Sequence, residues 1–232
     1  MKLLFIQSDP FAWIGKMSVS AVLKQAGHDC GILIEPAEKD LMRSIKEANP
    51  EIIAFSATTG VHTWALEKAR EIKRKFNIPI LFGGPHATFF PEIIENKNID
   101  FACIGEAEEA IVELLNALEE EKDTSKIKNI WSKTGEIIHK NPIRPLIQNL
   151  DELPFPDRSL YYKRYPFLKN QNSRDFIFMR GCPYQCSFCY NHSLQKMYKN
   201  NGKYIRFKNV DKAIEELLEV KQKWGLGSAY AF

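Results

Sequence analysis

The sequence predicts an α/β fold whose N-terminal part, about residues 1–125, is a doubly wound, five-stranded parallel sheet. Two observations carry this prediction. Short apolar runs alternate with amphipathic stretches, and glycine, proline or asparagine falls where each element should end. The apolar runs are continuous rather than alternating with polar residues, which is typical of parallel strands covered by helices on both faces.

The expected elements follow from the position of these runs. Strands are expected at Lys2–Gln7, Asp29–Ile34, Ile52–Ser56, Ile78–Phe82 and Phe101–Ile104. Helices are expected between and after them at about 17–26, 39–48, 62–76, 90–96 and 106–121. Because open sheets of this kind bind ligands at the carboxyl ends of their strands, we expect the N-terminal ligand there.

The rest of the chain divides into two further parts. Residues 126–172 combine a hairpin, Lys126–Trp131 with Glu136–His139, and a proline-rich connector that excludes regular helix. Residues 173–232 begin with a strand at Asp175–Met179. A helix at about 210–224 and a second strand near Ser228 follow, and the chain stops there.

Composition excludes several classes of function. The chain has 232 residues and a net charge of +3, which is too small to indicate binding to nucleic acid or to a membrane surface. No apolar run approaches the ~20 residues of a membrane span. Met1 leads directly into an apolar strand, without the architecture of a signal peptide. We therefore expect a cytoplasmic protein.

The cysteines indicate a metal centre. Cys182, Cys186 and Cys189 have the spacing C-x3-C-x2-C, whereas the other two cysteines, Cys30 and Cys103, sit in apolar runs and are expected to be buried. Three thiolates on one loop suit an iron–sulfur cluster with one iron left open. The alternative is a Cys3His zinc site completed by His192. The three-residue gap between the first two cysteines favours the cluster.

This loop resembles the signature of radical S-adenosylmethionine enzymes, in which an aromatic residue, here Phe188, precedes the third cysteine. The flanking Arg180-Gly181-Cys182-Pro183 strengthens the likeness. The resemblance implies a [4Fe-4S] cluster on the three loop cysteines, whose open iron binds S-adenosylmethionine. It implies that an electron, from a donor such as flavodoxin or ferredoxin, releases a 5′-deoxyadenosyl radical. It also implies that the backbone around Phe188 contacts the adenine.

Two segments at the expected ligand end of the sheet stand out. Ser56 and Thr58 follow the third strand, and Gly83-Gly84-Pro85-His86 follows the fourth. Paired glycines allow a large ligand to approach the backbone, although a Gly-Gly at a strand end is more often a tight turn. No G-x-G-x-x-G follows the first strand, which disfavours a dinucleotide.

Taken together, the chain resembles the cobalamin-binding radical S-adenosylmethionine proteins over essentially its whole length. The matching stretches are Gln25–Asp29, Ile53–Thr59, Phe82–Thr88, Ile104–Glu108 and Leu153–Arg158. The resemblance implies a flavodoxin-like first domain that binds cobalamin, followed by the start of a radical S-adenosylmethionine (β/α) barrel. The cobalamin contacts that it implies are Ser56, Thr58, Gly83, Gly84, Pro85, His86, Gly105 and Glu106. Because Asp9–Gly15 holds no histidine, we expect cobalt without a protein histidine ligand.

The implied function is a methyltransferase acting on an unactivated carbon, or a phosphorus, of a small-molecule or natural-product substrate, through methylcobalamin and the radical. One alternative is a cobalamin-dependent cyclase or rearrangement enzyme. Another is a truncated cobalamin and iron–sulfur binding module without turnover. About 43 residues follow Cys189, whereas a full barrel needs roughly 200 or more. On that view the barrel is incomplete, and residues 175–232 should be unstable and expose apolar surface.

Overall fold

A computed structural model describes residues 1–231. Phe232, which would continue the strand expected near Ser228, lies outside the described residues. Five parallel strands form the centre of the fold: β1 (Lys2–Gln7), β2 (Asp29–Ile34), β3 (Ile52–Ser56), β4 (Ile80–Gly83) and β5 (Phe101–Cys103). They lie in the order β2-β1-β3-β4-β5, as a doubly wound sheet requires. The predicted fold class is confirmed, and the first three strands have the expected bounds.

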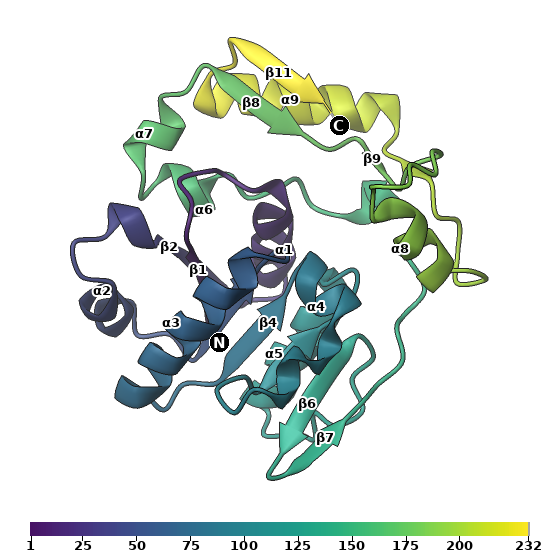
Figure 1. Cartoon of the computed structure of the whole chain (residues 1–232). Helices are drawn as coiled ribbons and strands as arrows, with labels where there is room; N and C mark the ends of the chain where they lie inside the picture. The colour runs from purple at the N-terminus through teal and green to yellow at the C-terminus, as the bar shows by residue number, and fades with distance from the viewer. Residues whose placement is uncertain (232) are drawn as a thin grey trace.

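Helices cover both faces of this sheet (Figure 1). They are α1 (Ile14–Gln25), α2 (Leu41–Ala48), α3 (Val61–Lys75), α4 (Pro85–Phe89) and α5 (Glu108–Glu119), with short turns η1 (Glu35–Ala37) and η2 (Pro91–Glu95). Successive side chains of β1 point to opposite faces. Leu3 and Phe5 therefore pack into one apolar core, and Leu4 and Ile6 pack into the other.

The expected single helix at 90–96 is wrong. The structure has α4 before it and η2 within it, separated by Phe90. Pro91 explains the break, because a proline has no backbone N–H to donate to the preceding turn and disfavours helical backbone in the residue before it.

A hairpin is present and belongs to the main sheet, but its first strand begins four residues later than predicted and includes Ser132–Thr134, which were expected in the turn. Its strands are β6 (Ile130–Thr134) and β7 (Ile137–His139), and Gly135 in the turn has a φ of +60°. Strand β6 pairs antiparallel with β5. The expected five-stranded sheet is therefore extended to seven strands, in the order β2-β1-β3-β4-β5-β6-β7.

The proline-rich connector crosses back over the α1 side of the sheet. It holds only the short turns η3 (Leu150–Glu152), α6 (Ser159–Tyr162) and α7 (Pro166–Lys169). The Asp157 carboxylate accepts hydrogen bonds from Ser20 and Lys24 of α1, each 2.6 Å long. Arg164 donates to Glu38 at 2.7 Å. The connector is thus an ordered segment fixed to the first domain.

The last part of the chain forms a separate layer. Strands β8 (Ser173–Phe176) and β11 (Ser228–Ala231) pair in parallel beside α9 (Val210–Trp224). The expected strand at Asp175–Met179 is split, because β8 ends at Phe176 and β9 (Met179–Arg180) pairs antiparallel with β10 (Arg206–Phe207). Helix α8 (Asn191–Met197) lies between β9 and β10 in the sequence.

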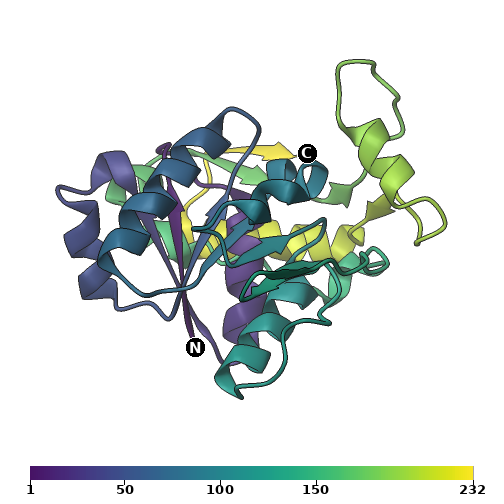
Figure 2. The ribbon, with the colours of Figure 1, turned by 60° about the horizontal axis from the view of Figure 1, so that its bottom comes forward.

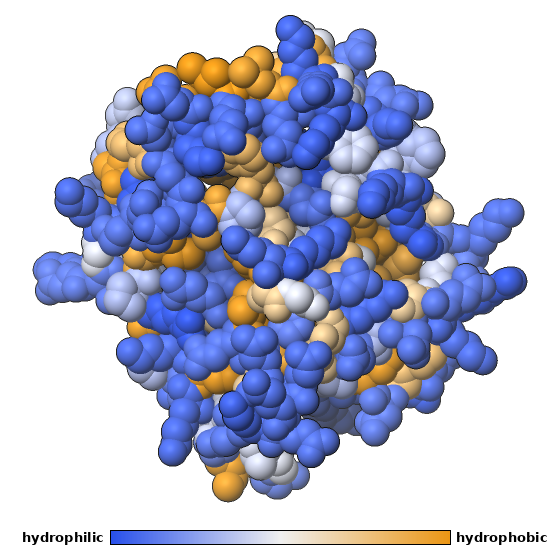
Figure 3. Space-filling model, turned by 180° about the vertical axis from the view of Figure 1, so that it is seen from behind, coloured by the Kyte–Doolittle hydropathy of each residue, from blue (hydrophilic) through white to orange (hydrophobic). Residues whose placement is uncertain are grey.

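Helix α9 leaves part of its apolar surface uncovered. Val210, Ile214 and Leu218 are exposed at helical spacing, as was expected of the chain's last part. Seen from behind, apolar atoms gather along the upper edge of the molecule, the side on which α9 and β11 lie in Figure 1 (Figure 3). Among residues 1–231, none of the helices combines the length and the apolar character needed to cross a membrane.

Candidate functional site

A cavity of about 470 Å³ opens at the carboxyl ends of β3, β4 and β5. One wall belongs to the first domain: Ile14, Gly15, Ser18, Ser56, Gly84, Pro85, Thr88, Phe89 and residues 105–108. The facing wall includes Leu146, Leu150, Leu153, Pro154 and Pro156 of the connector, and Met179, Arg180, Gly181, Tyr190, Tyr204, Arg206 and Lys208 beyond it. The cavity therefore lies at the predicted end of the sheet, enclosed between the first domain and the last part of the chain.

The turn after β4 brings backbone close to backbone. Gly84 has a φ of +87°, and a β-carbon there would lie 2.8 Å from the amide nitrogen of Ala57. Only glycine fits this position without strain. Thr88 connects this turn to the next one, because its hydroxyl donates to the Gly84 carbonyl and accepts from the Gly105 amide, both at 3.0 Å.

The structure brings most of the residues expected to contact cobalamin to this place. Ser56, Gly84, Pro85, Gly105 and Glu106 line the cavity, and Gly83 lines an adjoining cavity of about 60 Å³. Thr58 and His86 line neither cavity.

His86 is turned toward α3 instead. Its ring stacks on that of His62 with 3.8 Å between centroids, and its Nδ1 lies 3.0 Å from the Thr59 hydroxyl. Burial, and then the neighbouring His62, lower the pKa of His86. A neutral imidazole held in this stack is a packing residue of the first domain.

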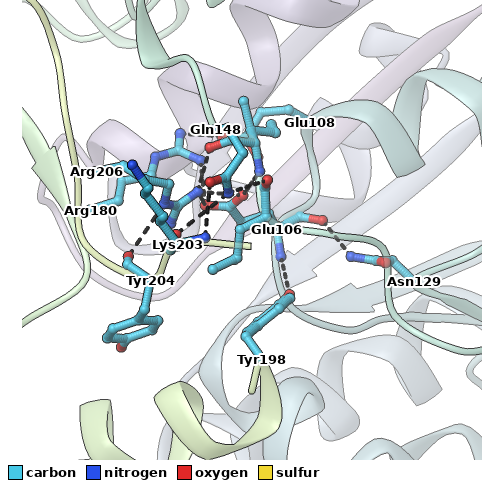
Figure 4. A network of polar contacts seen from close by, with 11 residues as sticks. Glu106, Glu108, Asn129, Gln148, Arg180, Tyr198, Lys203, Tyr204 and Arg206 are labelled. Carbon is cyan, nitrogen blue, oxygen red and sulfur yellow. Dashed lines mark hydrogen bonds and ion pairs between the residues drawn. The ribbon is translucent and has the colours of Figure 1, made fainter. Parts of the chain in front are cut away.

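An ion network of buried and half-buried side chains closes one side of the cavity (Figure 4). It comprises Glu106 and Glu108 after β5, Arg180 of β9 and Arg206 of β10, and we call it the Glu106 network. Arg180 bonds both glutamates, and Arg206 bonds Glu106 at 2.8 Å. Burial raises the pKa of Glu108, but the charge of Arg180 and its hydrogen bond outweigh burial and hold that pKa below its ordinary value. The Glu108 carboxylate is therefore an ionised partner of Arg180.

The cysteine loop begins and ends at the rim of the cavity. Gly181 before it and Tyr190 after it both line the cavity. Figure 2 shows the loop and α8, in lighter green, projecting from the body of the molecule. Cys186 is exposed and Phe188 is 92% exposed, whereas Cys182 and Cys189 are half-buried.

Two side chains at the start of α8 contact the end of the cysteine loop at Cys189. Asn191 donates from Nδ2 to the Cys189 sulfur at 3.4 Å, and His192 Nδ1 lies 2.8 Å from the Cys189 carbonyl oxygen. Within residues 1–231, the structure brings no three histidine, cysteine or acidic side chains into position around a single metal ion.

Comparison with known proteins identifies the first domain. A family model described as the B12 binding domain matches residues 9–115. An uncharacterized methyltransferase of Pyrococcus horikoshii is 34% identical over 212 residues, 86% of this chain and 44% of that protein. An anaerobic magnesium-protoporphyrin IX monomethyl ester cyclase of Synechocystis is 26% identical over 185 residues, 76% of this chain and 37% of that protein.

A solved structure shares the fold. It is the radical S-adenosylmethionine methyltransferase TsrM of Kitasatospora setae, which matches 100% of this chain and 47% of its own with a TM-score of 0.73 and 17% identity. The first domain matches the B12 binding domain family, and the chain as a whole is similar to cobalamin-dependent radical S-adenosylmethionine enzymes. It spans less than half the length of the curated relatives it matches.

The cavity fits the cofactor of this family. Gly84 lets the turn after β4 pack closely against Ser56 and Ala57 at the cavity, and the hydroxyls of Ser56, Ser18 and Thr88 supply polar contacts in a largely apolar space. No histidine lines the cavity among the described residues, in keeping with the absence of D-x-H-x-x-G from the β1–α1 loop.

The sequence alone does not indicate the roles of several residues at this site. Thr88 belongs to a stretch matched to the family, yet its bridging role depends on a loop 17 residues away. Arg206 and Lys208 lie on and beside a two-residue strand with no recognisable pattern. A cation that pairs with a carboxylate 100 residues earlier leaves no local signal in the sequence.

Proposed function

We propose that this chain carries the cobalamin site and the cluster site of a cobalamin-dependent radical S-adenosylmethionine methyltransferase. The observation that supports it is the shared cavity: one wall is the B12-binding domain, and the other contains both ends of the C-x3-C-x2-C loop. The cysteines themselves do not line the cavity, but both ends of their loop do, so a cluster on the loop and a cobalamin in the cavity would lie beside the same substrate.

The residues divide between the two cofactors. Cys182, Cys186 and Cys189 would hold the [4Fe-4S] cluster, and the backbone at the exposed Phe188 would contact the adenine of S-adenosylmethionine. The proposed cobalamin contacts are Ser56, Gly83, Gly84, Pro85 and Gly105. Thr58 and His86 are left out of this set because they line neither cavity.

The cofactors would supply the reactive chemistry, namely a transferable methyl group and a carbon-centred radical, while the protein positions them and excludes water. The connector prolines and leucines form the apolar side of the cavity. The proposed substrate is an unactivated carbon, or a phosphorus, of a small molecule or natural product. A reduced flavodoxin or ferredoxin would supply the electron at the exposed loop.

A second candidate function is cyclisation or rearrangement with the same cofactors. It is favoured by the 26% identity to a cyclase that covers 76% of this chain. Which of the two reactions takes place would depend on the substrate. The described residues around the cavity are suited to either reaction.

Anaerobic reconstitution of the chain tests the proposal. The protein is loaded with iron, sulfide and hydroxocobalamin, and iron and cobalt are counted before S-adenosylmethionine and a reductant are added. We expect about four irons and one cobalt per chain, with release of 5′-deoxyadenosine. The matched control replaces all three loop cysteines by serine, which should abolish the cluster and keep the cobalt. Zinc in place of iron would overturn the proposal.

A further inference from the structure

We propose that Glu106 is a positioning residue, which fixes the start of the cysteine loop against the cobalamin cavity. The inference builds on the proposed function and changes the role expected for Glu106, from a cofactor contact to a structural connection between the two cofactor sites. It rests on the number of chain segments that this one residue holds together.

The carboxylate of Glu106 has no free oxygen to offer a cofactor. Oε1 accepts from Arg180 at 3.0 Å and pairs with Arg206 at 2.8 Å. Oε2 accepts from Arg206 at 3.0 Å and from the amide of Ile147 at 2.9 Å. The donors come from β9, β10 and the connector, so a single carboxylate joins three segments that lie apart in the sequence.

The backbone around Glu106 holds two more segments. Its amide donates to the Tyr198 hydroxyl at 3.3 Å, and its carbonyl accepts from the Asn129 side chain at 2.8 Å. Gly105 is part of the same arrangement, because a β-carbon at this position would overlap the Tyr198 hydroxyl. Tyr198 closes α8, the helix that follows the cysteine loop. Glu106 therefore contacts the chain both before and after that loop.

The segments that Glu106 holds depend on outside contacts. Strands β9 and β10 have two residues each, and an isolated pair that short is not stable in water. Arg206 is buried, with its side chain 5% exposed, and Arg180 is partly buried, with its side chain 22% exposed. Two glutamates balance two arginines in the Glu106 network, so removing one carboxylate leaves a buried positive charge without its partner. The strand pair should then lose its fixed place beside the cavity.

Hydrogen exchange on the full chain, with and without hydroxocobalamin, tests this role. In Glu106→Gln we expect the amides of residues 179–181 and 204–208 to exchange at least about tenfold faster, while β1 to β5 stay protected. Cobalamin should still bind within a factor of about two of the wild-type Kd. The matched control is Glu109→Gln, an exposed acid three residues on, which should change neither quantity.

The possible outcomes bear on the positioning role of Glu106 as follows. A Glu106→Gln protein that binds cobalamin more weakly, with unchanged exchange at 179–181, would make Glu106 a cofactor contact and overturn the inference. Faster exchange spread evenly over β1 to β5 would also overturn it, since that indicates general destabilisation. If Glu106→Gln does not fold, Arg206→Lys tests the same connection, because one ammonium cannot replace the separate donations of a guanidinium. If the wild type binds no cobalamin, the proposed function fails, and the exchange comparison still tests the positioning role.

Discussion

Gly84 and Ser56 approach so closely that a β-carbon on Gly84 would lie 2.8 Å from the Ser56 hydroxyl oxygen. This contact joins the turn after β4 to the end of β3 at the floor of the cavity. We expect Gly84→Ala to lower the free energy of unfolding by about 2 kcal/mol, through the positive φ and the overlap together. It should also weaken cobalamin binding by at least about tenfold. Urea unfolding and absorbance titration measure the two effects.

Gly135→Ala provides the control for backbone strain alone. Gly135 also has a positive φ, +60°, but nothing lies within 4 Å of a β-carbon there. Its substitution should cost about 1 kcal/mol and leave the Kd for cobalamin unchanged. An equal loss of cobalamin affinity in both variants would show that the close approach at Gly84 has no part in binding.

The five cysteines should separate into two classes by reactivity. Burial raises the pKa of Cys30 and of Cys103 to about 12, so both thiols stay protonated and covered. The loop cysteines are half-buried or exposed. Iodoacetamide at pH 8, applied to reduced, cluster-free protein, should label Cys182, Cys186 and Cys189 only, as mass spectrometry would show. Urea-unfolded protein should label at all five, and fast native labelling of Cys103 would contradict the buried placement.

Glu216 is the buried acid that holds α9 to the connector and to the residue after β10. Its side chain is 1% exposed, lies 3.8 Å from Arg158, and bonds Lys208. Glu216→Gln leaves two buried cations without their counter-charge, so we expect a loss of about 3 kcal/mol or more in stability, measured by urea unfolding. The neighbouring Glu215 is 59% exposed and pairs with Lys212 at the surface. Glu215→Gln should cost less than about 0.5 kcal/mol, and similar losses in both variants would refute the assignment.

Stability should fall in acid through Glu38, which fixes the connector to the first domain. Burial raises the pKa of Glu38, but hydrogen bonds from Arg164, Ser44 and Tyr165 outweigh burial and lower that pKa to about 2. A pKa lowered on folding contributes stability above the unfolded value of about 4.3, and this is lost as pH falls toward 2.

The Glu38→Gln variant isolates this contribution. After allowance for solvent screening, we expect it to be about 1 kcal/mol less stable than wild type at pH 7. The difference should shrink below pH 4 and nearly vanish at pH 2. Urea midpoints at pH 7, 4 and 3 test this, and a difference that stays constant with pH would contradict the ion pair.

The elements that the sequence predicts correctly are those whose signals lie in a few neighbouring residues. The first three strands are largely apolar runs bounded by clear breakers, and their predicted bounds agree with the structure. The start of α1 was placed three residues late, because its N-cap position is Trp13, whose side chain makes no capping hydrogen bond. Without a serine, threonine, aspartate or asparagine there, the sequence offered no start signal.

What the sequence could not show depends on contacts between distant segments. Nothing near Glu106 indicates Arg180 or Arg206, 74 and 100 residues away. The stacking of His86 on His62 is equally invisible, since the two residues follow different strands. The family resemblance located the ligand end of the sheet, but only the folded chain shows which of those side chains face the cavity.

The hairpin β6–β7 also affects whether strands of other chains can pair with the edge of the first domain's sheet. By pairing with β5 it covers the outer edge of the last parallel strand, a row of backbone groups that would otherwise attract strands from other molecules. The edge that remains is the three-residue strand β7, in a segment that lines neither cavity. Any shortened form of the cobalamin domain should retain residues through His139, because cutting before Ile130 would bare that edge and favour insoluble assemblies.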